Sequence, residues 1–165
     1  MRRTYLEGSS SCSFLEGNWI SATFIDNWSE FGGPKEEGIK NITRHACASR
    51  IKIIEEDCFK VDKAHLDKYN LYLYDGNHAS ENHYNAIMKF YDDLEDIAIV
   101  LIDDWNWPNV RSATNRAIKE LKIPIFYERE IQLNPEDLVD MPRHKGKDTW
   151  WNGIYVFAFN KNLPC

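Results

Sequence analysis

The sequence predicts an α/β fold built on a mostly parallel sheet of seven strands, with the last strand antiparallel and helices on both faces. Short apolar runs alternate along the chain with polar or helical segments, which is the pattern of a doubly wound sheet. Several runs are apolar throughout, as expected for strands buried on both faces. The 165 residues, 43% of them hydrophobic, suit one core. We therefore expect a single domain over residues 1–165.

Seven apolar runs are predicted strands. In chain order they are Thr4–Glu7, Ser21–Asp26, Ile51–Glu55, Leu71–Tyr74, Ile97–Ile102, Ile123–Tyr127 and Ile154–Phe159. The link from Asn134 to Asn152 contains no good crossover helix, and a parallel connection normally needs one. The last strand is therefore expected to run antiparallel beside Ile123–Tyr127. Leu71–Tyr74 and Ile97–Ile102 are expected to be neighbours.

Helical periodicity marks the segments between strands. Apolar side chains recur at three- and four-residue spacing over Tyr84–Leu94 and again over Val110–Leu121, which indicates helices with one buried face. A third helix is predicted from Lys35 to about His45, because Pro34 precedes it and proline suits a first helical turn.

Charge and apolar run length exclude two classes of partner. The net charge is −6, whereas binding to a nucleic-acid backbone needs a concentrated basic face. No apolar run approaches the length of a membrane span, and the N-terminus lacks the apolar stretch of a signal peptide. The four cysteines show no CxxC pairing, so we expect reduced thiols and a cytoplasmic protein. The sequence leaves the oligomeric state open.

Acidic residues follow five consecutive predicted strands. They are Glu7, Asp26, Asp57, Asp75 and the Asp103-Asp104 pair. Ligands of doubly wound sheets bind beyond the carboxyl ends of the strands, and unpaired carboxylates gathered there repel one another. Each acidic residue could instead cap the helix that follows it. Five in succession favour a ligand site.

The acidic residues divide into two groups by position. In nucleotide-binding sheets an acidic residue that ends the second strand accepts hydrogen bonds from ribose hydroxyls, which suits Asp26, and Asp57 could reach an adenine amine. By contrast, Asp75, Asp103 and Asp104 follow two strands that are expected to be neighbours. Three hard oxygen ligands without cysteine suit Mg²⁺, Mn²⁺ or Ca²⁺ better than Zn²⁺.

Two segments resemble a known family. Tyr74-Asp75-Gly76-Asn77-His78 and Ile102-Asp103-Asp104-Trp105 look like motifs of the class I S-adenosylmethionine-dependent methyltransferases that modify hydroxyls of sugars and small natural products. Those enzymes carry an Asp-Gly-Asp-His type motif after strand four and an Asp-Asp pair after strand five. The resemblance extends from about Tyr5 to Phe159 and implies a three-layer Rossmann-like methyltransferase fold.

The resemblance also implies a cofactor site and a metal site. The residues carried over for S-adenosylmethionine are Glu7, Gly8, Asp26, Asn27, Trp28, Asp57, Cys58 and Asp75, and those for Mg²⁺ or Mn²⁺ are Asp75, Asp103 and Asp104. The ion would orient the acceptor and lower the pKa of the hydroxyl to be methylated. His78 matches the family's candidate general base, a role that suits imidazole. Its alternative role is a hydrogen bond at a helix start.

The Asp103-Asp104 pair imposes a condition on the backbone. Successive strand residues point to opposite faces, so both can serve one ion only if the chain bends there. Leaving the strand at Asp104 would provide that bend. Asp75 and Asp104 are therefore expected to be stronger ligands than Asp103.

The first motif departs from the family pattern. One glycine, Gly8, precedes a serine run, and only 11 residues extend from Gly8 to Asn18, so the first helix should have one or two turns. Two alternatives remain open, a degenerate non-catalytic binding module and a metal-dependent hydrolase. The acceptor is expected to be a saccharide or other small molecule. Aromatic faces could stack on its ring, although packing under a loop is the commoner use of tryptophan; the candidates are Trp105, Trp107, Trp150 and Trp151.

Overall fold

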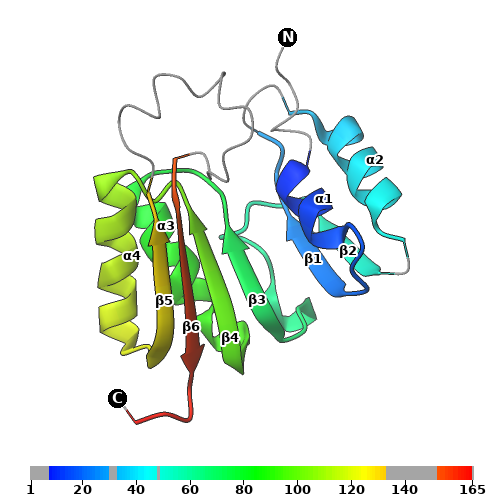
Figure 1. Cartoon of the computed structure of the whole chain (residues 1–165). Helices are drawn as coiled ribbons and strands as arrows, with labels where there is room; N and C mark the ends of the chain where they lie inside the picture. Colours follow the sequence, from blue (N-terminus) through cyan, green and yellow to red (C-terminus); the bar gives the residue numbers. More distant parts are fainter. Residues whose placement is uncertain (1–7, 30–32, 48, 133–151, 165) are drawn as a thin grey trace. The chain divides into compact units, whose positions relative to one another are not determined.

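The computed structural model describes residues 8–29, 33–47, 49–132 and 152–164. The chain divides into two compact units, the N-terminal unit Met1–Leu66 and the C-terminal unit Asp67–Cys165, and each is described by itself (Figure 1). The predicted strand Thr4–Glu7 lies outside the described residues. That residues 1–165 form a single domain stays a prediction.

The N-terminal unit contains a parallel strand pair and two α-helices. Its elements are α1 (Ser9–Leu15), β1 (Ser21–Ile25), α2 (Lys35–His45), β2 (Arg50–Ile54) and the 3₁₀ turn η1 (Lys63–His65). β1 and β2 pair in parallel from Ser21 opposite Arg50 to Ile25 opposite Ile54. α1 has seven residues, which confirms the predicted short first helix.

The C-terminal unit contains a four-stranded mixed sheet. Its elements are β3 (Tyr69–Tyr74), α3 (Ser80–Phe90), η2 (Tyr91–Asp93), β4 (Leu94–Asp103), α4 (Pro108–Leu121), β5 (Ile125–Ile131) and β6 (Ile154–Asn160). The strand order is β3-β4-β6-β5. β3 and β4 are parallel neighbours, as predicted, and β6 runs antiparallel beside β5, also as predicted.

The predicted seven-stranded, mostly parallel Rossmann-like sheet is wrong. The described strands form two sheets, of two and four strands, and two of the three strand pairs in the larger sheet are antiparallel because β6 inserts between β4 and β5. The physical reason lies in the composition of the last two strands. β6 is apolar, with Phe157 and Phe159 fully buried, and therefore belongs in the interior of a sheet. β5 carries Glu128, Arg129 and Glu130, and charged side chains are typical of an edge strand.

Helices α3 and α4 pack against each other on one face of the four-stranded sheet (Figure 1). The ring of Tyr72 on β3 contacts Phe90 of α3, and Tyr74 meets His83 edge to face at a centroid distance of 4.9 Å. Within the described part of this unit the opposite face has no helix, and Ile97 and Ile99 on that face are 57% and 44% exposed. Within the described residues of this unit, helices therefore lie on one face of the sheet only. Among the described residues, no helix has the length and apolar character to span a membrane.

Candidate functional site

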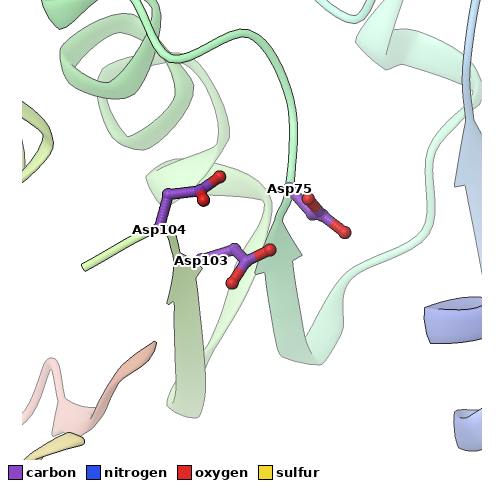
Figure 2. Close-up of side chains that lie close together, drawn as sticks. All are labelled: Asp75, Asp103 and Asp104. Carbon is purple, nitrogen blue, oxygen red and sulfur yellow. The ribbon is translucent and has the colours of Figure 1, made fainter. Parts of the chain in front are cut away.

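Three carboxylates converge at the carboxyl ends of β3 and β4. Asp75, Asp103 and Asp104 each place an oxygen within 4.8 Å of the others, and Figure 2 shows them at the ends of two neighbouring strands. Asp75 is exposed, Asp103 is half-buried and Asp104 is only 6% exposed. We call these three residues the acidic cluster. Their hard oxygen donors fit a Mg²⁺ or Mn²⁺ ion.

Strand register and a backbone bend bring the acidic cluster together. Tyr74, the last residue of β3, lies opposite Ile102 of β4, so Asp75 and Asp103 leave the sheet at the same level. Asp104 then adopts a left-handed conformation with φ of 57°. Strand alternation ends at that residue, which allows its side chain to join that of Asp103. The bend expected at Asp104 is confirmed.

The Asp104 carboxylate is held at both oxygens. Oδ2 lies 2.5 Å from Nε2 of His78, and Oδ1 accepts a hydrogen bond of 2.8 Å from Nδ2 of Asn152. An ionised carboxylate only accepts hydrogen bonds, so the Nε2 atom of His78 is the donor in this contact and Nδ1 is the ring nitrogen that faces away from Asp104. His78 and Asp104 thus form an oriented imidazole–carboxylate pair.

The surroundings of His78 fix its backbone and one face of its ring. Nδ2 of Asn109, in α4, donates a 2.7 Å hydrogen bond to the carbonyl of His78. The ring of Trp107 lies 5.2 Å from the imidazole, centroid to centroid, and its backbone N–H donates to the Asp104 carbonyl at 3.0 Å. Trp107 is 43% exposed whereas Trp105 is fully buried. Only Trp107 of this pair is open to a ring-shaped ligand.

Asn77 and Gly76 have local structural roles between Asp75 and His78. Oδ1 of Asn77 accepts hydrogen bonds from the Ala79 backbone N–H and from Nδ2 of Asn82, both at 3.0 Å, so this side chain organises the start of α3. At Gly76 an added Cβ would lie 2.9 Å from the Tyr74 ring, so any side chain there would require the tyrosine ring to move. The Asp-Gly-Asn-His segment therefore has a structural reason for its glycine and its asparagine.

The residues predicted to bind the cofactor are divided between the units. Glu7 lies outside the described residues; Gly8, Asp26, Asn27, Trp28, Asp57 and Cys58 belong to the N-terminal unit, and Asp75 to the C-terminal unit. Gly8 is the N-cap of α1 with φ of 84°.

Three of these side chains close local turns. Oδ1 of Asp26 accepts from the Trp28 N–H at 2.7 Å, and Oδ1 of Asp57 accepts from the Phe59 N–H at 2.9 Å. Asn27 binds the N–H of Ser29 in the same way. In these turns each side chain accepts a hydrogen bond from a backbone N–H two residues further along the chain, which resembles the capping role considered above as an alternative to ligand binding. Cofactor binding by this unit stays a prediction.

Asn152 is a partner of the acidic cluster that was not predicted from the sequence. The available signal was the Asn152-Gly153 pair just before the last strand, because Asn-Gly marks a turn with positive φ. This turn lies near Asp104 only because β6 pairs with β4. The sequence-based prediction had placed β6 beside β5 alone. Trp150 and Trp151, in the same link, lie outside the described residues.

The chain matches no family model and no curated protein. Among solved structures it is similar to the crystal structure of Thermoplasma acidophilum 1320, with a TM-score of 0.46 and 12% sequence identity over 96% of this chain and 88% of that chain. At this level of similarity the comparison supports no functional conclusion. Any function must be argued from the acidic cluster and its neighbours.

Proposed function

We propose that this chain is a metal-dependent O-methyltransferase that transfers the methyl group of S-adenosylmethionine to a hydroxyl of a saccharide or other small molecule. The supporting observation is the acidic cluster next to the oriented His78–Asp104 pair. Carboxylate oxygens alone, without thiolates, suit Mg²⁺ or Mn²⁺. The resemblance of the two segments around the cluster to methyltransferase motifs supplies the reaction class.

In this proposal the chain's residues bind the ion and remove a proton. Asp75, Asp103 and Asp104 would hold a divalent ion, whose positive charge would make a nearby hydroxyl more acidic. Nδ1 of His78 accepts the hydroxyl proton, and the carboxylate on Nε2 stabilises the imidazolium that forms. S-adenosylmethionine supplies an electrophilic methyl group on a sulfonium. The acceptor oxygen would form the new bond to carbon as the carbon–sulfur bond breaks, and S-adenosylhomocysteine would be the leaving group.

Trp107 supports a ring-shaped acceptor. It is partly exposed, and its ring lies beside His78. An indole face can stack on the apolar face of a sugar ring or on an aromatic ring. Such stacking would present the hydroxyls at the edge of the acceptor ring toward the imidazole.

Calorimetry of the full chain with S-adenosylmethionine, S-adenosylhomocysteine and Mn²⁺ tests the proposal. We expect both cofactor forms and the ion to bind. The double variant Asp103→Asn/Asp104→Asn should lose Mn²⁺ binding, whereas the control Asp92→Asn/Asp96→Asn, which removes two exposed carboxylates outside the cluster, should retain it. Absence of binding by both cofactor forms to the wild type would refute the methyltransferase assignment.

A metal-dependent hydrolase is the second candidate, because an imidazole–carboxylate pair beside a divalent ion also suits deprotonation of water. The same titrations separate the two functions. A hydrolase would bind Mn²⁺ at the acidic cluster without binding S-adenosylmethionine. It would also hydrolyse a chromogenic phosphate or carboxylic ester in a reaction that chelation abolishes.

A further inference from the structure

We propose that Asn152 is a positioning residue that holds the Asp104 carboxylate in the orientation needed to bind the divalent ion. The inference rests on the proposed function, since it concerns the same metal site. It starts from the 2.8 Å hydrogen bond that Nδ2 of Asn152 donates to Oδ1 of Asp104. The two residues are 48 positions apart in the chain, so the fold and not local sequence joins them.

The backbone around Asn152 is clamped to the loop that carries Asp104. The carbonyl of Asn152 accepts a 2.7 Å hydrogen bond from the Asn106 N–H, and the carbonyl of Gly153 accepts one of 3.2 Å from the Trp105 N–H. These bonds continue the antiparallel pairing of β4 with β6, which ends with Asp103 opposite Ile154. The position of the Asn152 side chain relative to Asp104 is therefore set by the sheet.

The backbone conformation explains why the residue is asparagine. Asn152 has φ of 57°, a left-handed conformation that glycine, asparagine and aspartate adopt most readily. Among these three, only asparagine provides an N–H donor from its side chain. At Gly153, with φ of 77°, an added Cβ would lie 2.6 Å from the Ile131 carbonyl oxygen. Glycine there leaves room for the clamp.

The hydrogen bond restricts rotation of the carboxylate. With Nε2 of His78 on Oδ2 and Asn152 on Oδ1, the carboxylate plane is fixed from two sides. Each carboxylate oxygen has two lone pairs, so one on each stays available to an ion after these bonds form. Partners of this kind hold metal ligands in place, and their loss typically lowers metal affinity about 10- to 100-fold.

The test is Mn²⁺ binding by Asn152→Gly, measured by electron paramagnetic resonance and calorimetry on the full chain. Glycine retains the left-handed conformation and removes the donor. Lys122→Gly is the matched control, since Lys122 also has a left-handed φ, of 50°, at the end of α4. We expect Asn152→Gly to weaken Mn²⁺ binding about 10- to 100-fold with a thermal midpoint in the absence of metal close to that of wild type. Wild-type Mn²⁺ affinity in a folded Asn152→Gly would overturn the inference and leave the proposed function intact.

A second measurement uses the unmodified chain, so the test does not depend on the folding of a variant. In ¹⁵N-labelled protein, the side-chain amide signals of Asn152 should shift during a Mg²⁺ titration, whereas those of Asn162, two residues beyond the C-terminal end of β6, should not. Unmoved Asn152 signals in a protein that binds Mg²⁺ would contradict the positioning role. Absence of Mn²⁺ and Mg²⁺ binding by the wild type would overturn the metal site of the proposed function, and this inference with it.

Discussion

The rings of Trp105 and Tyr155 stack with centroids 4.3 Å apart and planes inclined by 18°. Both side chains are buried, Trp105 completely. The backbone carbonyl of Trp105 also accepts a 2.6 Å hydrogen bond from Nη1 of Arg111. The stack therefore fixes the loop after Asp104 to β6 by side-chain packing, in addition to the backbone hydrogen bonds.

Replacing Trp105 with alanine should remove this packing and leave a cavity. We expect Trp105→Ala to lower the free energy of unfolding by about 3–5 kcal/mol. Trp107→Ala is the control, and because Trp107 is 43% exposed its loss should cost under about 1 kcal/mol. Urea unfolding followed by circular dichroism measures both. Equal losses in the two variants would show that Trp105 does not anchor the loop.

The cofactor prediction is tested most cleanly by Asp26→Asn. The amide oxygen of asparagine can still accept the hydrogen bond from the Trp28 N–H, so the local turn is retained while the charge is removed. Loss of a charge-assisted contact to ribose should weaken S-adenosylmethionine binding about 10- to 100-fold. Calorimetry gives the affinity, with Asp62→Asn as the control, since Asp62 closes a similar turn with Ala64. Unchanged affinity in Asp26→Asn would assign the ribose to another residue.

The role of His78 is tested by glutamine, which can donate to Asp104 but cannot take up a proton near neutral pH. His78→Gln should reduce methyl transfer about 100- to 10,000-fold while S-adenosylmethionine affinity stays close to that of wild type. His45→Gln is the control, because His45 also contacts a carboxylate, that of Glu16, in the N-terminal unit. Formation of S-adenosylhomocysteine is the measurement. A fully active His78→Gln would exclude the proton transfer.

His83 makes the stability of the fold dependent on pH. Its ring is 1% exposed, and neither ring nitrogen has a hydrogen-bond partner among the described residues. Burial, with a smaller contribution from His78, lowers the pKa of His83 from 6.5 to about 4. The folded chain thus binds fewer protons than the unfolded chain between these values. The stabilisation is complete above pH 6.5 and is lost as the pH falls toward 4.

The pH effect can be isolated with His83→Phe, which keeps an aromatic ring against Tyr74 but does not titrate. Between pH 7 and pH 4.5 the wild type should lose roughly 2–3 kcal/mol more free energy of unfolding than the variant. Urea unfolding at the two pH values measures the difference. Parallel losses in the two proteins would show that His83 binds protons equally in the folded and unfolded chains, so that burial does not lower its pKa.

The sequence predicted individual elements better than their arrangement. The helix over Lys35–His45 and the strands around Leu71–Tyr74 and Ile97–Ile102 were recognisable because apolar periodicity is a local property. Sheet pairing is not local, so the insertion of β6 between β4 and β5 was missed, although the charges of β5 suggest an edge. That same insertion carries Asn152 to Asp104. A partner contributed by non-local pairing could not be assigned from the acidic motif alone.

The position of β6 also bears on the order of events during synthesis. Residues Ile97–Asp103 of β4 pair with Asn160–Ile154 of β6, and β5 has β6 as its only neighbour among the described strands. Because translation proceeds from the N-terminus, β5 is synthesised before β6. Its native hydrogen-bonding partner is therefore absent until β6 has also been synthesised. Of the four strands, only β3 and β4 can pair before then. Closure of this sheet is therefore a late step, and until β6 emerges this edge of β4 lacks its native hydrogen-bonding partner.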